Sequence, residues 1–595
     1  MTGRDHFTAD DFAKADAIAG DYFSRGGQPA IAYGIVVGGD LVHSAGFGDR
    51  VLGAGPPDAS TVFRIASMSK SFTASAILLL RDAGALALDD PAAQYVPELA
   101  GWTCGSPDAA PITIRQLLTM TAGFPTDDPW GDRQQGLPIG DFDRLLANGV
   151  SFNWAPGTRF EYSNLGYAIL GRVLAAASGG PYDEFVRTRL LAPLGLTRTG
   201  FSAHEFEPDN LAVGYRHGLA GWTEVPFDPY GAFAPMGGVF STVADLARWV
   251  AGFAAAFPPG ADGDENSSDS HPLRPASRRQ LQLPQAVTGW PAAGRLPGGP
   301  PGPPEFYGFG LFVDEDPALG RVVSHSGGYP GFGSNMRWHP ATGIGVIALG
   351  NGTYAPMSPL TGLLLAALVP AAPGYQIALA PAEGNAAAGA PWPATLKAQR
   401  DVNRLIPAWD DAVADALFTE NVAQDGPYEE RRHAIGLVRD RIGEFTADPD
   451  RKAESDTPAH RRWWLTGEHG TVQAQIQLSP ELPPRVMSLS LAIPPAPDSV
   501  LARALDAVID WLNDPDPAAE WPAELPVAAT ADPGLIARRL RMAAGWAGKC
   551  AIGAYQAGSG SAATTVELVG EHATVTLSLL VNRATGELRQ ADVIL

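Results

Sequence analysis

Ser67 and Lys70 stand three residues apart at the start of an apolar stretch, in the order Ser-Met-Ser-Lys. In a helix this spacing places both side chains on one face, where the lysine amine can accept the serine proton. The free N–H groups at a helix start also favour the oxyanion that forms when a carbonyl carbon is attacked. The pattern indicates nucleophilic acyl transfer. The same spacing also occurs in ordinary helices, as a cap and a solvated lysine.

Tyr162 and Asn164 form a second candidate motif, just before an apolar helix predicted over residues 165–177. A tyrosine held near Lys70 could pass a proton to a leaving group, and Asn164 could donate a hydrogen bond to a substrate carbonyl. The alternatives are structural, because asparagine is a good helix cap and tyrosine a common core residue. A catalytic role for this segment is supported only by its position in the chain between the first motif and the third.

The third motif is His325-Ser326-Gly327, followed by Gly328, at the end of a predicted strand. Glycines at a strand edge allow a substrate backbone to approach closely. A backbone N–H just after the motif could complete an oxyanion hole with that of Ser67. A lone histidine at a strand end is more often structural, so the argument depends on the three motifs occurring in order.

These motifs resemble those of the serine beta-lactamase and penicillin-binding protein superfamily. The resemblance is to its class C beta-lactamase-like branch, which includes D-aminopeptidases, D-stereospecific carboxypeptidases and esterases. Further segments occur in the order that this branch shows: residues 63–66, 114–118 before 121–124, and 236–242 before 245–246.

The resemblance implies a role for each motif residue. Ser67 would be the acylated nucleophile, with Lys70 and Tyr162 as the acid–base pair. Asn164 would bind substrate. His325, Ser326 and Gly327 would form the third motif, and Gly328 would supply the second oxyanion N–H. No cofactor or metal is implied.

Two positions depart from the pattern of many relatives. Met120 stands where a histidine is frequent, so a polar contact near the site is expected to be missing. His325 replaces the lysine of beta-lactamases, and a histidine is largely neutral near pH 7 whereas a lysine carries a fixed charge. Efficient beta-lactam hydrolysis is therefore not expected.

The leading functional hypothesis is a serine hydrolase of small amides or short peptides, with a D-residue at the acyl position. An esterase or lactonase of the same fold is the close alternative, because it would use the same motifs. A beta-lactamase, a DD-peptidase and a non-catalytic scaffold are weaker alternatives. Substrate choice is expected to lie in loops such as 124–150 and 256–306.

The elements that position these residues indicate an α+β fold of the beta-lactamase type over residues 1–375. Two strands, 30–37 and 41–48, flank a glycine turn and predict a hairpin. A helix is predicted over 67–84, and strands over 321–326, 332–338 and 344–349. The early and late strands should form one antiparallel sheet with flanking helices and a helical region.

Composition excludes several other classes of protein. The chain has 595 residues and a formal net charge of −22, which disfavours nucleic acid and anionic membranes as partners. No membrane span or secretion signal is recognised, so a cytoplasmic protein with no membrane partner is predicted. Cys104 and Cys550 show no disulfide or metal-binding spacing and are expected to be buried packing residues.

The remainder of the chain shows an internal similarity. A proline- and alanine-rich linker is predicted over 376–395. Leu-Thr-Gly-Glu-His-Gly-Thr-Val at 465–472 then resembles Leu-Val-Gly-Glu-His-Ala-Thr-Val at 568–575. We therefore expect two α+β copies, 396–493 and 494–595. A stabilising or assembly module is the favoured role, with homo-oligomer formation or restriction of substrate size as alternatives, and the Glu-His pairs are expected to be turn residues.

Overall fold

The computed structural model divides the chain into two compact units, Met1–Leu379 and Ala380–Leu595. The structure describes residues 7–594 apart from positions 129, 219–220, 258–270, 290–304, 317, 373–374, 376–390, 426, 456, 515–520, 522–524, 529–532, 535, 538–539, 542–546 and 583–584. Most of the predicted linker 376–395, and much of the predicted loop 256–306, therefore lie outside the described residues.

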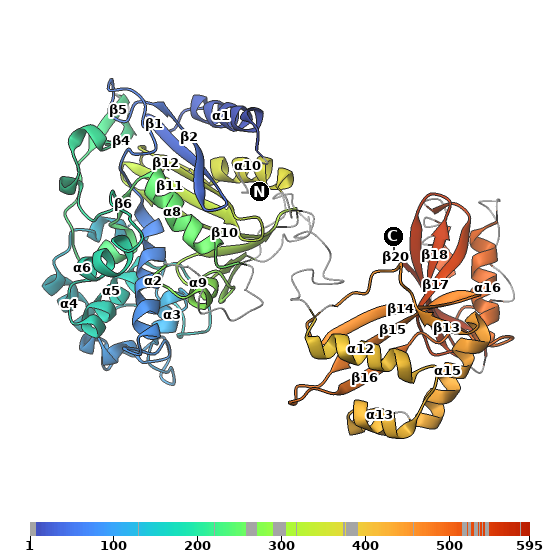
Figure 1. The fold of residues 1–595 in the computed structure, drawn as a ribbon. Coiled ribbons are helices and arrows are strands. Elements are labelled where there is room, and N and C mark those ends of the chain that lie inside the picture. The colour runs from blue at the N-terminus through green and yellow to red at the C-terminus, as the bar shows by residue number, and fades with distance from the viewer. Residues whose placement is uncertain are drawn as a thin grey trace. The chain divides into compact units, whose positions relative to one another are not determined.

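The first unit is built on an eight-stranded antiparallel sheet, in agreement with the predicted α+β class (Figure 1). Its strand order is β2-β1-β12-β11-β10-β9-β8-β7, so β1, from the start of the unit, pairs with β12, from its end. The bounds are β1 Ala30–Val37, β2 Asp40–Gly48, β7 Ala286–Gly289, β8 Glu305–Tyr307, β9 Phe312–Asp316, β10 Gly320–Tyr329, β11 Phe332–His339 and β12 Ile344–Gly350. Strands β1 and β12 are buried throughout, as their continuous apolar sequences require.

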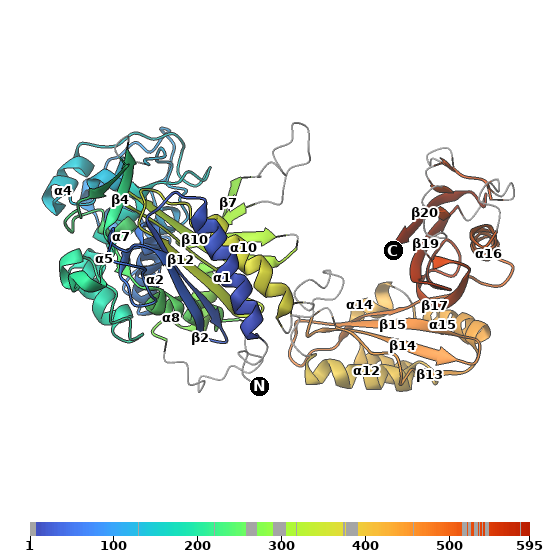
Figure 2. The same ribbon diagram turned by 90° about the horizontal axis from the view of Figure 1, so that it is seen from above.

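Helices cover both faces of this sheet (Figure 2). Helices α1 (Ala9–Ser24) and α10 (Ser358–Leu368) lie on one face, and α8 (Val243–Ala254) packs against the other. Beyond α8 lies a helical region centred on α2 (Ser69–Asp82) and α5 (Asn164–Ser178). The remaining elements are α3 Ile114–Leu118, α4 Ile139–Ala147, α6 Tyr182–Val186, α7 Ala234–Gly237, α9 Pro275–Leu281, and the short strands β3 Phe63–Arg64, β4 Gly214–Gly218, β5 Gly221–Val225 and β6 Phe240–Ser241.

The predicted helix over 67–84 differs from the structure at its start. A 3-10 turn, Ala66–Met68, comes first, and α2 begins only at Ser69. Ala66 has φ = 48°, a left-handed conformation that costs a non-glycine residue of order 1–3 kcal/mol and cannot continue a helix. Periodicity alone could not reveal this break, because the apolar pattern runs through it.

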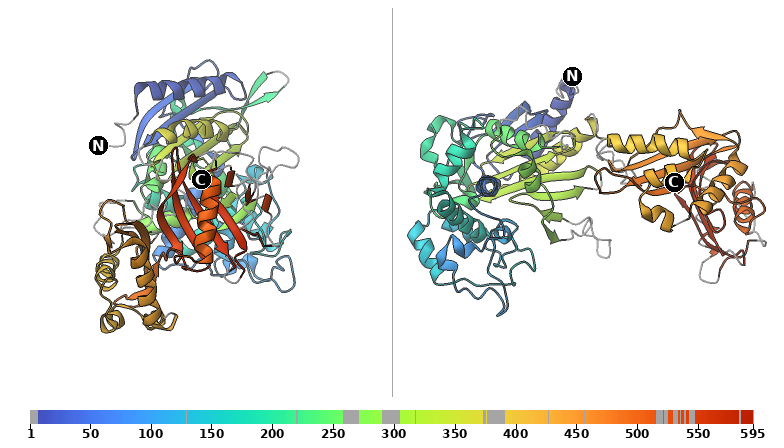
Figure 3. Two further views of the ribbon diagram at one scale, coloured as in Figure 1. Left: turned by 90° about the vertical axis from the view of Figure 1, so that its right-hand side faces the viewer. Right: turned by 60° about the horizontal axis from the view of Figure 1, so that its bottom comes forward.

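The second unit contains another eight-stranded sheet, flanked by helices (Figure 3). The path β13-β14-β15-β17-β18-β19-β20 accounts for seven strands, and β16 also pairs with β15. The bounds are α12 Pro393–Leu405, α13 Asp411–Leu417, α14 Glu420–Asp425, α15 Tyr428–Ile442, β13 Phe445–Ala447, β14 His460–Gly467, β15 Gly470–Leu478, β16 Val486–Leu491, α16 Val500–Leu512, β17 Cys550–Gly558, β18 Ala563–Gly570, β19 Thr574–Val581 and β20 Leu588–Ile594.

Both similar segments form hairpin turns with matching contacts. The N–H of His469, between β14 and β15, donates to Ile442 O at 3.0 Å. The N–H of His572, between β18 and β19, donates to Ala547 O at 2.9 Å. The residue after each acceptor carbonyl is a glycine, Gly443 after Ile442 and Gly548 after Ala547. Each glycine has a positive φ and lies against the Glu-His turn of its copy. We infer from this repetition that the tail contains two tandem copies.

Three properties of the described residues bear on partners. No helix in this part of the chain is long and apolar enough to cross a membrane. No group of three or more His, Cys, Asp or Glu among the same residues is arranged to hold a metal ion. Cys104 and Cys550 are both buried free thiols.

Candidate active site

The turn before α2 presents Ser67 at the floor of a cleft. The left-handed Ala66 reverses the chain, and Ser69 fixes the turn by donating from its hydroxyl to Ala66 O at 2.6 Å. The same Ser69 hydroxyl accepts a hydrogen bond from the N–H of Val239 at 3.0 Å. Because Ser69 is fully buried and bonded on both sides, the turn is held rigidly and Ser67 remains partly exposed.

Lys70 lies directly behind Ser67 and is completely buried. Its Nζ donates to Ser67 Oγ at 2.8 Å, to Asn164 Oδ1 at 2.8 Å and to the carbonyl of Met236 at 3.0 Å. Two of these partners can only accept, so a neutral amine would keep two N–H bonds and turn its lone pair toward Ser67. Burial lowers the pKa of Lys70 to about 8, against the opposing effect of nearby aspartates.

Tyr162 lines the cleft together with Ser67, whose side chain is close enough to affect the pKa of the phenol. Its ring centre is 4.9 Å from Lys70 Nζ. Burial raises the pKa of Tyr162 well above 10, so the hydroxyl is protonated in the resting protein. The structure therefore brings Ser67, Lys70 and Tyr162 together at one end of the cleft.

Met120 holds the segment that carries Tyr162. Its carbonyl accepts from the N–H of Glu161 at 2.9 Å, and its Sδ accepts from the N–H of Ser163 at 3.3 Å. The expected gap in polar contacts at this position is therefore wrong, because the thioether and the backbone, with φ = 59°, supply acceptors on both sides of Tyr162.

Asn164 is the first residue of α5, and its side chain is fully buried beside Lys70. Besides accepting from Lys70, it donates through Nδ2 to the carboxylate of Asp128. Asp127 caps the helix instead, accepting from the N–H groups of Asn164 at 2.7 Å and Leu165 at 2.8 Å. Asn164 therefore orients the lysine, and both ends of its amide already have partners.

His325 faces Tyr162 across the cleft, with ring centres 6.5 Å apart. Its Nδ1 lies 2.6 Å from the carbonyl of Ser326, which can only accept, so Nδ1 carries the proton. Nε2 is then the acceptor for the Tyr307 hydroxyl, 3.3 Å away. Burial, together with the charge of Lys70, lowers the pKa of His325 to about 3, so the ring is neutral near pH 7.

The end of β10 forms the open side of the cleft. Residues 320–324 pair with β9, whereas 325–329 pair only with β11 on the opposite edge. Gly327 is required here, because a Cβ atom would lie 2.2 Å from the carbonyl of Ile65. Ser326 is exposed and its hydroxyl accepts from Asn335 at 2.8 Å, while Gly328 lines the cleft beside Tyr354.

The resulting cleft has a volume of about 520 Å³. Five of its lining residues were predicted from the sequence, and the four that were not are Asp128, Asp132, Phe312 and Tyr354. The acidic residues lie in the loop predicted to choose the substrate, and their clustering after Phe124 was the available signal. Phe312 and Tyr354 carry no such signal, because only the folding of the sheet brings them to the cleft.

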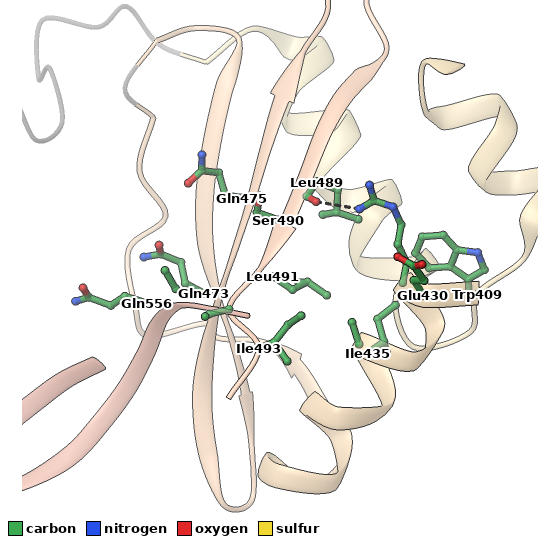
Figure 4. A pocket seen from close by; sticks show the side chains of 15 residues that line it. Trp409, Glu430, Ile435, Gln473, Gln475, Leu489, Ser490, Leu491, Ile493 and Gln556 are labelled. Carbon is green, nitrogen blue, oxygen red and sulfur yellow. Dashed lines mark hydrogen bonds between the residues drawn. The ribbon is translucent and has the colours of Figure 1, made fainter. Parts of the chain in front are cut away.

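A second cavity, of about 560 Å³, lies in the tail (Figure 4). Gln473, Gln475 and Gln556 project from strands on one side, and Ile435 lies on helix α15 on the other. Arg431 closes part of the helix side by donating to the carbonyl of Leu489 at 3.1 Å. None of the described residues around this cavity is a serine placed against a buried base, so it lacks the arrangement found at Ser67.

Comparison with known proteins supports the fold and the family. The family model described as Beta-lactamase matches residues 13–370. Penicillin-binding protein 4* of Bacillus subtilis is 27% identical over 317 residues, covering 50% of this chain and 63% of that protein. Protein flp of Staphylococcus aureus (strain COL) is 28% identical over 353 residues, covering 58% of this chain and 64% of that protein. The chain thus matches less than two thirds of the length of these relatives.

A solved structure, described as the octameric penicillin-binding protein homologue from Pyrococcus abyssi, has a similar fold. It aligns with a TM-score of 0.52 and 20% sequence identity over 96% of both chains. The family match extends over most of the first unit and includes all three motifs. The chain therefore belongs to the beta-lactamase family, within the superfamily of serine beta-lactamases and penicillin-binding proteins.

Proposed function

We propose that this protein hydrolyses small amides or short peptides through an acyl-enzyme formed on Ser67. The observation that carries the proposal is the position of Lys70. Its buried amine is 2.8 Å from Ser67 Oγ and is held by two acceptors that a neutral amine still satisfies. A serine in contact with a buried, partly deprotonated amine is activated as a nucleophile.

In the proposed reaction, Ser67 Oγ attacks the substrate carbonyl while its proton passes to Lys70. The N–H groups of Ser67 and Gly328 would stabilise the oxyanion, and Tyr162 would return a proton to the leaving nitrogen. A water molecule would then hydrolyse the ester on Ser67 and release the acid. His325 would line the substrate site as a neutral group.

An acylating probe tests the nucleophile directly. A fluorophosphonate or a penicillin should modify Ser67, as found by peptide mass spectrometry, and the name of the Bacillus subtilis relative makes penicillin a natural choice. Ser67→Ala should lose labelling and turnover, whereas Ser24→Ala, at an exposed serine of α1 whose hydroxyl donates to Asp21 O, should still be labelled at Ser67. Labelling that survives in a folded Ser67→Ala protein would overturn the proposal.

The substrate class is tested with a panel of chromogenic compounds. D-Alanine p-nitroanilide, the L-alanine analogue, short-chain p-nitrophenyl esters and nitrocefin report on amidase, stereochemical, esterase and beta-lactamase activity. We expect the D-anilide to be the best amide and nitrocefin to be turned over poorly, because neutral His325 offers no charge to a carboxylate. Turnover of esters alone would favour the esterase alternative.

We also propose that the chain forms a homo-oligomer. The proposal draws on the structure from Pyrococcus abyssi, whose title describes an octamer and which covers the tail as well as the first unit. Light scattering on the full chain should give a mass that is a multiple of 62.4 kDa. A mass equal to one chain at micromolar concentration would contradict this expectation.

A further inference from the structure

Among the described residues that line the cleft, the charged side chains are all acidic. Asp128 and Asp132 line it with carboxylates, whereas His325 is neutral and already bonded at both ring nitrogens. Lys70 lies behind Ser67, and its three hydrogen bonds go to protein atoms. Among the described lining residues, the cleft therefore offers carboxylates but no cation to a substrate.

Asp132 is the more unusual of the two carboxylates, because only 3% of the residue is exposed. Its Oδ2 accepts from the Tyr354 hydroxyl at 2.8 Å. Within the described part of the chain, no hydrogen-bond donor reaches Oδ1. Because Asp132 lines the cleft, a ligand bound there can supply the donor that Oδ1 lacks among the described residues.

The nearest arginine does not fill this role. Arg64 is buried, and its Nε donates to the carbonyl of Gly237 at 3.3 Å. Its nearest carboxylate is that of Asp228 at 3.7 Å, and its guanidinium stacks 3.9 Å from the ring centre of Tyr329. Arg64 therefore influences Asp132 only at a distance, as Lys70 does.

We infer that Asp132, assisted by Asp128, binds a protonated amino group that the substrate carries close to its scissile carbonyl. The inference rests on the proposed function and narrows its substrate class. Amides of amino acids and peptides with a free amino terminus would be preferred over N-acylated or carboxylate-bearing analogues. A substrate ammonium can donate to the free Oδ1 and offset the repulsion between the two carboxylates.

Two isosteric substrates isolate the charge. D-Alanine p-nitroanilide carries an ammonium where D-lactic acid p-nitroanilide carries a hydroxyl, and the two are otherwise alike in size. In the wild-type protein we expect kcat/KM to favour the alanyl compound by about tenfold or more. A ratio of one or below, in a protein that turns over the lactyl compound, would overturn the inference.

Replacement of the carboxylate locates the preference. Asp132→Asn should reduce the ratio by about tenfold, through a higher KM for the alanyl compound. Asp89→Asn is the matched control, because that carboxylate is exposed and bonded to Arg115 outside the cleft. An unchanged ratio in folded Asp132→Asn would contradict the assignment. If this variant does not fold, the wild-type ratio still decides whether the cleft selects an ammonium, and Asp128→Asn tests the acidic pair.

The pH dependence of the same ratio gives a second readout. Burial, with a smaller contribution from Asp128, raises the pKa of Asp132 to about 6, so this carboxylate gains a proton as the pH falls from 7 to 5. The groups that act on it are Lys70, Arg64 and the Tyr354 hydroxyl. The alanyl preference should decline over this range. A preference that stays constant would contradict the role of Asp132.

The two levels of proposal fail in different ways. If Ser67 is labelled and the lactyl compound is hydrolysed while the alanyl compound has no advantage, only the inference about Asp132 fails. If neither compound is hydrolysed and Ser67 is not labelled, the proposed function fails, and the inference fails with it.

Discussion

The cleft at Ser67 and the second cavity, in the tail and here called the tail groove, have almost the same volume, about 520 and 560 Å³, yet they differ in what surrounds them. The cleft has a buried lysine, a neutral buried histidine and a strained turn, each held by named hydrogen bonds. The groove is lined by partly exposed glutamines, by apolar residues such as Trp409 and Ile435, and by the ionisable pair Glu430 and Arg431. Preorganised groups with shifted pKa values distinguish a reactive site from an equally large hollow.

The groove has a structural origin. It lies where β16 and β17 both approach the same edge of β15 and then diverge. Two strands that share one neighbour in this way leave a gap between them. The comparison therefore predicts large effects for changes in the cleft and small ones for changes in the tail.

Replacement of the base should have the largest effect. Lys70→Met keeps a similar length but cannot take a proton, so acylation of Ser67 should slow by about 10²- to 10⁴-fold in single-turnover measurements. Lys397→Met, in the tail, is the control, because that lysine is exposed and pairs with Asp401. Near-normal acylation in Lys70→Met would show that Lys70 is not the base, and a buried base would then no longer distinguish the cleft from the groove.

A change of charge at the third motif should come next. His325→Lys introduces a cation into a cleft that now presents carboxylates, and should shift the ratio of kcat/KM toward carboxylate-bearing substrates by about tenfold to a hundredfold. The ratio is measured with matched amide and carboxylate substrates. If it does not move in a folded, active variant, His325 has a structural or proton-transfer role instead.

The pH dependence of acylation sharpens the same distinction. Burial lowers the pKa of Lys70 to about 8, and a general base acts in its deprotonated form. The value of kcat/KM for a neutral substrate should therefore rise about tenfold per pH unit well below pH 8 and level off above it. A profile that is flat between pH 6 and 9 would show that the protonation state of Lys70 does not control kcat/KM.

The smallest effects are expected in the groove. Gln475→Ala and Trp409→Ala change the lining of the groove and leave every residue of the three motifs as it is. The value of kcat/KM should therefore stay within about twofold of the wild type. The assay uses the same neutral anilide. A tenfold loss of kcat/KM in either variant would mean that the tail takes part in the reaction. It would contradict the expectation that only the cleft at Ser67 is reactive.

The sequence predicted the fold class and the family because independent local signals agreed. Short apolar runs such as 30–37 and 344–349 predict strands, and both were found, as β1 and β12. The family prediction is confirmed by the match over residues 13–370. Ser67, Lys70, Tyr162 and His325 were identified as candidates and lie around one cleft, while their catalytic roles stay predictions.

The rest of the site depended on long-range packing. Asp132 lies at the cleft beside Tyr354, a residue far along the chain whose hydroxyl donates to its carboxylate. Met120 was misjudged from its side-chain type, although its backbone and sulfur supply the acceptors that this position needs. The clustering of acidic residues after Phe124 could have drawn attention to Asp132, but neither its pairing with Tyr354 nor the acceptor role of Met120 leaves a signal in the local sequence.

The way the tail's sheet is joined has a consequence for its motion. In the described part of the chain, β15 pairs with β17 at a single position, Val472 with Tyr555, whereas β14 and β15 pair along their whole lengths. Few hydrogen bonds oppose opening along this line, although one apolar core continues beneath it. The tail should therefore bend as two stiff half-sheets about a narrow seam, and amide hydrogens should exchange fastest along that seam.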